Sequence, residues 1–128
     1  MAKTAIKSRD ATIGKFTSAL EKTDEIDLTV TGRISGHKTT RPVWFVHEDG
    51  KIYLLPVKGS ETEWYKNVVK NPTIELSAEG ETLTGKAKPT TDSARVKEIV
   101  AKFRAKYGAG QVKKYYSKFD VAIEVDAE

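Results

Sequence analysis

The sequence predicts a mainly β fold of the α+β class, a barrel of six antiparallel strands with helices packed around it. Three patterns support this prediction. Apolar residues alternate with a period of two in short runs, as half-buried strands require. The Asp49-Gly50 pair supplies the positive φ angles of a tight hairpin, and Glu79-Gly80 joins a second pair of runs in the same way. Between the strands, apolar residues recur at the spacing of amphipathic helices.

The chain forms a single predicted domain over residues 1–128 and begins with a polar, basic segment at 1–9 that we expect to be flexible. A first amphipathic helix follows, because apolar residues recur there at intervals of three and four. Three strands come next. These four elements are predicted at 10–20, 26–32, 39–47 and 51–57.

The second of these strands contains two adjacent aromatic residues and a proline. Pro42 is tolerated only in an edge strand or at a bulge. Trp44 and Phe45 must point to opposite faces, so one enters the core while the other lies outside or at an interface. If Trp44 is the outward residue, a second subunit can bury it.

The second half of the chain continues with helices and strands. A capping box of Ser60 and Glu63 starts the second helix, and Asn71-Pro72 ends it. Asp92 caps a third helix with an apolar stripe, and the glycines at 108–110 end it. The opposite face of this third helix is basic; it is either solvated or able to reach a phosphate or a nucleic-acid backbone. The predicted elements are a helix at 61–70, strands at 73–78 and 81–88, a helix from Asp92, a basic-aromatic segment at 112–119 and a strand at 121–125.

The composition excludes several classes of protein. No apolar run approaches the ~20 residues of a membrane-spanning helix, and the start lacks the apolar stretch of a secretory signal, so we expect a cytoplasmic protein. Without cysteine there is no disulfide, thiolate ligand or cysteine nucleophile. The two histidines have no acidic residues beside them at metal-ligand spacing, so no metal site is expected. A net charge of +4 favours phosphorylated ligands but is too small to indicate nucleic acid.

The stretch 28–60 carries most of the functional information, because its loops bring cations to the ends of three strands. Arg33, Lys38 and Arg41 precede Lys58, which stands beside the amide groups of a first helical turn. Several charge-assisted hydrogen bonds can hold a phosphate there. We interpret the stretch as the anion-binding half of a cofactor site at the barrel rim, and the alternative is a solvated polar loop. This interpretation requires Arg33, Lys38 and Lys58 to share one cavity.

Four motifs in this region resemble a known family. They are TGRISG at 31–36, TTRPV at 39–43, KGS at 58–60 and WYKN at 64–67. In this order they are similar to the deazaflavin-dependent nitroreductases, flavin/deazaflavin oxidoreductases that share a split β-barrel with the pyridoxamine-phosphate oxidases. The resemblance implies an FMN-binding-like split barrel that binds coenzyme F420, a deazaflavin. Such an enzyme would transfer a hydride between F420 and a small organic acceptor such as a nitro compound or a quinone.

The resemblance also implies roles for particular residues. Those near the cofactor would be Arg33, Ser35, Gly36, Lys38, Arg41, Lys58, Gly59, Ser60 and Trp64. Those of the substrate pocket would be Tyr65, Tyr115 and Tyr116. No residue is assigned as catalytic, because hydride transfer from the cofactor ring requires no protein base.

Other interpretations remain open. FMN would suit the same barrel, since its single terminal phosphate needs fewer cations. A binding module without redox activity, for nucleic acid or an acidic metabolite, is a second alternative, although no stacking row of aromatic residues stands beside the basic ones. An oligonucleotide-binding barrel is the nearest structural competitor. The family resemblance is compatible with a homodimer.

Overall fold

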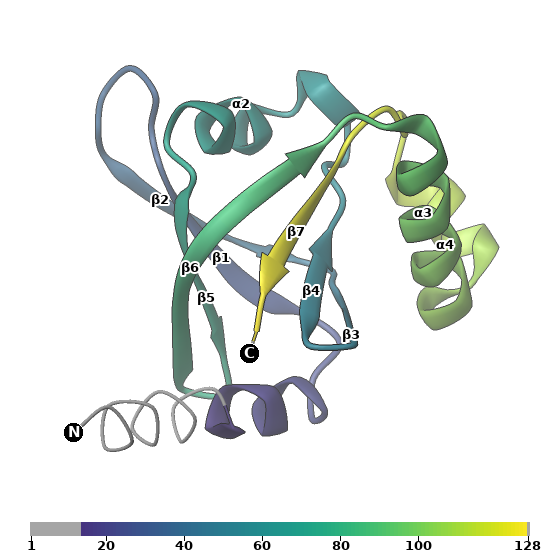
Figure 1. The fold of residues 1–128 in the computed structure, drawn as a ribbon, viewed down its shortest axis with the longest axis horizontal. Helices are drawn as coiled ribbons and strands as arrows, with labels where there is room; N and C mark the ends of the chain where they lie inside the picture. The colour runs from purple at the N-terminus through teal and green to yellow at the C-terminus, as the bar shows by residue number, and fades with distance from the viewer. Residues whose placement is uncertain (1–13, 128) are drawn as a thin grey trace.

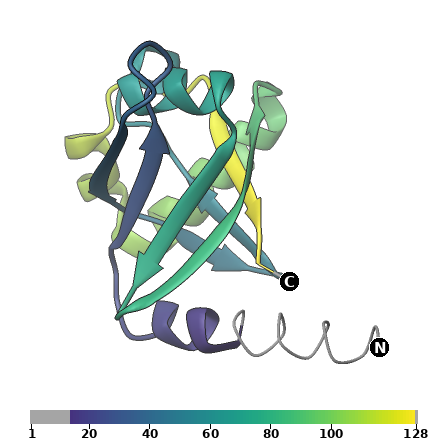
Figure 2. The same cartoon turned by 90° about the vertical axis from the view of Figure 1, so that its left-hand side faces the viewer.

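The computed structural model describes residues 14–127, which form one curled antiparallel sheet and several helices (Figures 1 and 2). Residues 14–20 are helical, and the predicted start of that helix at Asp10 lies outside the described residues. The strands are β1 (Ile26–Thr31), β2 (Lys38–Val43), β3 (Val46–Glu48), β4 (Lys51–Leu54), β5 (Thr73–Ala78), β6 (Glu81–Thr90) and β7 (Ala122–Asp126). The helices are the 3₁₀ turn η1 (Gly59–Glu61), α2 (Glu63–Lys70), α3 (Ser93–Tyr107) and α4 (Ala109–Tyr115).

The sheet curls into a split barrel. Its strand order is β2-β1-β5-β6-β7-β4-β3, and every pair of neighbours is antiparallel. The long strand β6 pairs with β5 through its first half and with β7 through its second half, so it turns the sheet from one side of the barrel to the other. The two end strands, β2 and β3, are consecutive in the chain, so the curled sheet nearly closes on itself.

The sheet has seven strands rather than the predicted six, because the expected strand at 39–47 is interrupted at Trp44 and Phe45. The amide of Phe45 donates to the hydroxyl of Tyr107 at 3.1 Å instead of to a neighbouring strand. That hydroxyl also lies 2.7 Å from the carbonyl oxygen of Asp24. A side chain from α3 therefore satisfies the backbone at the interruption, which sequence alternation cannot reveal.

The predicted turns and the cap of α3 are confirmed. Asp49 and Gly50 have φ angles of 53° and 72°, and Glu79 and Gly80 have 49° and 82°, as two-residue hairpins of this kind require. The side chain of Asp92 accepts a hydrogen bond from the backbone of Arg95 at 3.0 Å. Pro42 lies in β2, an edge strand, where its missing N–H costs no ladder bond.

Two predictions of local structure are wrong. The strand expected at 51–57 ends at Leu54. The capping box of Ser60 and Glu63 does not form: α2 begins after Thr62, and Ser60 instead bonds to Asp120. Gly108 ends α3 with a φ of 94°, as predicted, and the chain then forms the short helix α4, for which no prediction was made from the sequence.

Two apolar clusters lie on opposite faces of the sheet. One fills the inside of the curl and includes Phe45 and the inward residues of α2, such as Trp64 and Val68. The other lies between the outer side of β3 and β4 and the helices α3 and α4, which cover that side in Figure 1. Trp44 packs against this second cluster, so Trp44 and Phe45 do point to opposite faces, as predicted. Among the described helices, none is both long and apolar enough to cross a lipid bilayer.

Candidate functional site

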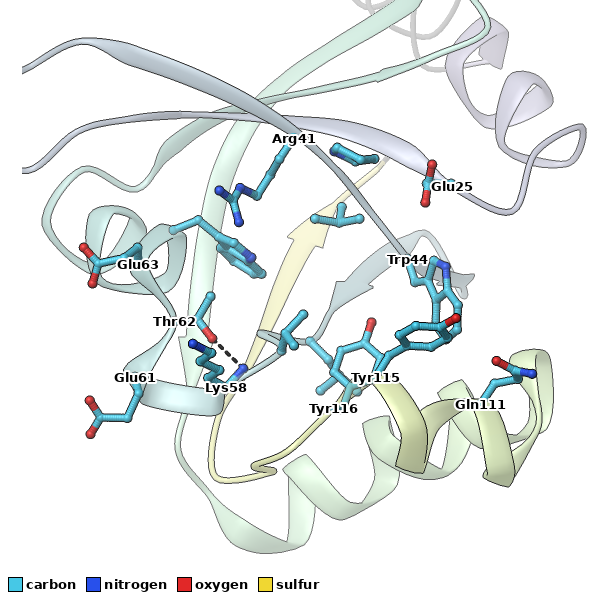
Figure 3. A pocket seen from close by; sticks show the side chains of 15 residues that line it. Glu25, Arg41, Trp44, Lys58, Glu61, Thr62, Glu63, Gln111, Tyr115 and Tyr116 are labelled. Atoms are coloured by element: carbon cyan, nitrogen blue, oxygen red, sulfur yellow. Dashed lines mark hydrogen bonds between the residues drawn. The ribbon is translucent and has the colours of Figure 1, made fainter.

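A pocket of about 720 Å³ opens where β2 and the segment after β4 diverge (Figure 3). Strands β3 and β4 pair only between Val46 and Tyr53 and their hairpin. The segment before Val46 and the segment after Tyr53 therefore lie apart. Helices α2 and α4 supply the remaining walls. The lining residues are Glu25, Arg41, Pro42, Val43, Trp44, Leu55, Val57, Lys58, Glu61, Thr62, Glu63, Trp64, Gln111, Tyr115 and Tyr116. This volume lies within the range of sites for small ligands and cofactors.

The pleat of β2 decides which of its cations reaches the pocket. Arg41 stands opposite Leu28 in the ladder and so shares the inward face of the sheet. Lys38 stands opposite Thr31 on the outward face, where its ammonium pairs with Glu75 at 3.4 Å. The inward face of β2 is uncovered near Arg41, so this guanidinium remains exposed at the pocket wall.

Lys58 reaches the pocket from the turn that precedes α2. Its backbone N–H donates to the hydroxyl of Thr62 at 2.8 Å, the bond drawn in Figure 3. Gly59 follows with a φ of 57°, a left-handed conformation that glycine adopts without strain. The next amide, that of Ser60, donates to the carboxylate of Asp120 at 2.9 Å, and the Ser60 hydroxyl bonds the same carboxylate at 2.5 Å. The Ser60 amide, expected from the sequence to bind a phosphate, therefore binds a carboxylate of the protein instead.

Arg33 lies outside the pocket lining and connects the β1–β2 hairpin to α2. Its backbone N–H and its guanidinium both donate to the side-chain oxygen of Asn67, at 3.1 and 2.8 Å. The guanidinium also pairs with Glu63 at 3.1 Å. Hydrogen bonding and attraction to Arg33 lower the pKa of the Glu63 carboxyl. Arg33 therefore affects the charge of the pocket indirectly, because it neutralises Glu63, which lines the pocket wall.

Three further residues of the predicted site also lie outside the lining. The hydroxyl of Ser35 accepts a bond from the His37 amide at 3.1 Å, within the hairpin turn. Gly36 supplies the positive φ of that turn, 75°. Tyr65, on the inward side of α2, is buried in the core, and this burial raises the pKa of its phenol.

Aromatic side chains form one wall of the pocket. Trp44 stacks on Tyr107 with ring centroids 4.2 Å apart and meets Tyr115 edge-on at 5.4 Å. Tyr116 is buried, which raises the pKa of its phenol, so the hydroxyl stays protonated at neutral pH. Tyr115 is 49% exposed at the pocket mouth. Such a wall offers flat apolar surface with hydroxyl groups at its edge.

Among residues 14–127, two acids of the pocket walls have cationic partners, whereas two cations of the walls have no ion-pair partner. Lys66 lies 3.7 Å from both Glu61 and Glu63, and Arg33 adds a second cation at Glu63. By contrast, neither Arg41 nor Lys58 forms an ion pair with any residue from 14 to 127. In Figure 3 these two cations lie on the side of the pocket next to α2, whereas Trp44 and Gln111 lie on the opposite side. The arrangement suits a ligand with an anionic group and a flat ring.

The structure thus brings five of the predicted site residues to one pocket and adds others that the sequence did not indicate. The five are Arg41, Lys58, Trp64, Tyr115 and Tyr116. The requirement that Arg33, Lys38 and Lys58 share one cavity is therefore not met: only Lys58 lines the pocket, and its companion there is Arg41. Trp44 and Gln111 were missed: the sequence left open whether Trp44 or Phe45 enters the core, and Gln111 lies on the helix α4 that was not predicted.

Comparison with solved structures shows the same fold in several proteins. One, described as an F420-H2 dependent reductase, is 23% identical with a TM-score of 0.63 over 80% of this chain and 94% of its own. Another, described as a domain-swapped dimer, is also 23% identical, with a TM-score of 0.63 over 80% of each chain. A Listeria innocua protein described as a candidate pyridoxamine 5'-phosphate oxidase is 18% identical, with a TM-score of 0.63 over 88% of this chain and 90% of its own.

The comparison with protein families assigns the chain more narrowly. Residues 2–128 match the family described as F420H(2)-dependent quinone reductase, which covers the whole described fold and every wall of the pocket. With its split barrel and its aromatic-walled pocket, the chain belongs to the F420H(2)-dependent quinone reductase family and is a deazaflavin-dependent oxidoreductase.

Proposed function

We propose that this enzyme transfers a hydride from reduced F420 to a quinone or a related small acceptor in the pocket between β2, α2 and α4. The observation that carries the proposal is the pair of cations without ion-pair partners among residues 14–127, Arg41 and Lys58, in a pocket with an aromatic wall. F420 joins an anionic tail to a flat deazaflavin ring, and these two features match the two kinds of wall.

Arg41 and Lys58 would bind the anionic part of the cofactor. Arg41 offers a planar fork of donors that fits a phosphate or carboxylate with two bonds, and Lys58 adds a compact charge. Lys66 and Arg33 support this arrangement, since they neutralise Glu61 and Glu63, which would otherwise repel an anion from the same side. The bound deazaflavin supplies the hydride.

The aromatic wall would hold the reacting rings. Trp44 and Tyr115 present ring faces and edges at the mouth, where a flat acceptor can lie against the cofactor ring and exclude water. The protonated hydroxyl of Tyr116 can donate a hydrogen bond to a quinone or nitro oxygen as negative charge develops on it. Quinone and nitro acceptors share this need for a donor, and turnover with each would rank them.

The test is a fluorescence titration with oxidised F420 on three matched variants. Arg41→Ala and Lys58→Ala should each weaken binding by about tenfold or more, since each loses a charge-assisted bond to the cofactor. Lys38→Ala is the control: it removes the same charge from the same hairpin, but from the outer face of the sheet. Equal weakening in Lys38→Ala, or unchanged binding in both pocket variants, would contradict the proposal. Titration with FMN in parallel decides between the two cofactors.

A further inference from the structure

Asp120 lies beneath the turn that presents Lys58 and has no role in the family resemblance or the pocket lining. Its carboxylate accepts two hydrogen bonds from Ser60, from the amide at 2.9 Å and from the hydroxyl at 2.5 Å. Lys118 lies 3.6 Å away on the same side. Burial opposes ionisation of Asp120, but the bonds from Ser60, the backbone amide of Asp120 itself and the charge of Lys118 together lower the pKa of the carboxyl, so the group is anionic at neutral pH.

The carboxylate is the centre of a larger contact between two distant segments. The amide of Ser117 donates to the carbonyl of Val57 at 2.9 Å, and Lys58 forms an isolated β-bridge with Lys118. A Cβ atom on Gly59 would lie 2.1 Å from the Asp120 Oδ1 atom. The carboxylate therefore packs directly against the backbone of the turn.

The backbone around Lys58 is fixed on every side. Its N–H donates to Thr62, and its carbonyl accepts from the amide of Glu61 at 3.1 Å. The amide of Gly59 donates to Pro56 at 3.0 Å. Both neighbours of Lys58 are held, since Val57 accepts from Ser117 and Gly59 donates to Pro56. Asp120 holds the following residue, Ser60, and the Cα–Cβ direction of Lys58 is set toward the pocket. A long, flexible side chain loses less entropy on binding an anion when its base is fixed in this way.

We propose that Asp120 is a positioning residue, which fixes the 57–60 turn so that Lys58 faces the anionic group of the ligand. The inference rests on the proposed role of Lys58 and assigns its preorganisation to a carboxylate 60 residues away in the chain from Ser60. Asp120 acts through the turn rather than on the ligand. Its effect on binding is therefore coupled to Lys58 and independent of Arg41.

A double-mutant cycle tests this coupling by titration of oxidised F420. Asp120→Ala should weaken binding by about fivefold in the wild-type protein and in the Arg41→Ala background. In the Lys58→Ala background it should have no further effect, because the side chain that it positions is gone. Asp120→Asn should restore most of the affinity, since the amide keeps an acceptor for the Ser60 amide and a donor for its hydroxyl. Asp126→Ala, which breaks two surface ion pairs on β7, is the matched control.

Each outcome decides the inference. An equal loss in the wild-type and Lys58→Ala backgrounds would mean that Asp120 supports the whole fold, and no loss would mean that the turn holds its shape alone; either result overturns the inference. Unchanged binding in Lys58→Ala alone would also overturn the inference for binding, because Asp120 would then position a side chain that does not contact the ligand; unchanged binding in both Lys58→Ala and Arg41→Ala would overturn the proposed function. Amide hydrogen exchange then still decides the structural claim without any ligand: Asp120→Ala should accelerate exchange at Ser60 relative to Asp126→Ala, and equal exchange would refute it.

Discussion

Replacing Gly59 by alanine should destabilise the protein in two ways, because the added Cβ atom would both strain the backbone and clash with neighbouring side chains. The φ of 57° costs an alanine about 1 kcal/mol relative to glycine. The new Cβ would stand 2.1 Å from Asp120 Oδ1, so the carboxylate must move away from Ser60. Loss of a charged hydrogen bond there adds about 2 kcal/mol. The Cγ and Cβ atoms of Lys118, 3.0 and 3.1 Å from the same point, belong to the base of its side chain and must also shift by a few tenths of an ångström.

Gly59→Ala should therefore lower the free energy of unfolding by about 3 kcal/mol, which corresponds to roughly 10 °C in Tm for a domain of this size. Gly80→Ala is the matched control, because Gly80 has a φ of 82° but nothing within 4 Å of a Cβ. It should lose only the backbone cost of about 1 kcal/mol. Urea denaturation followed by circular dichroism measures both. Equal losses in the two variants would refute the packing argument at Gly59.

Two further predictions concern ion pairs on β7. Arg95→Met should lower the free energy of unfolding, measured by urea denaturation, by about 2 kcal/mol, because it leaves the largely buried Glu124 without its partner at 2.9 Å. Adding Glu124→Gln should recover most of that loss. A double variant no more stable than Arg95→Met would contradict this explanation. Hydrogen bonds from Lys51 and Lys88 lower the pKa of Asp126 below its ordinary 3.8, so its stabilisation is present above that value and is lost as pH falls through the folded-state pKa. Asp126→Asn should therefore flatten the acid side of the stability curve, and an unchanged acid limb would contradict the assignment.

The basic face of α3 shows how the fold uses charges that composition alone leaves unexplained. From the sequence alone, this face was expected either to be solvated or to contact a phosphate or a nucleic-acid backbone. In the structure Arg95 pairs with Glu124 and Glu98, and Lys102 pairs with Glu48 at 2.5 Å. Lys106 donates to the carbonyl of Phe45 at 2.8 Å and lies over its ring. Much of this face therefore connects α3 to the sheet.

Local chemistry made the turns and most of the elements predictable. Asp49-Gly50 forms its hairpin because two successive positive φ angles favour those residues wherever the pair stands in the fold. Asp92 caps α3 because a carboxylate three residues before a free amide satisfies it without help from the rest of the chain. The alternation in β1 likewise predicted which of its residues are buried.

Contacts between distant segments decided the rest. Arg41 and Lys38 are both cations of the same strand, and local sequence does not distinguish their roles. The register of β2 against β1 directs Arg41 inward to the pocket and Lys38 outward to Glu75. The sequence also predicted that amides near Ser60 bind a phosphate, but in the structure the Ser60 amide donates to Asp120, which is distant in the chain. The sequence alone determined most of the strands, the turns and the family motifs. The tertiary structure decided which charges remain without partners, because neutralisation depends on distances across the fold that no local pattern encodes.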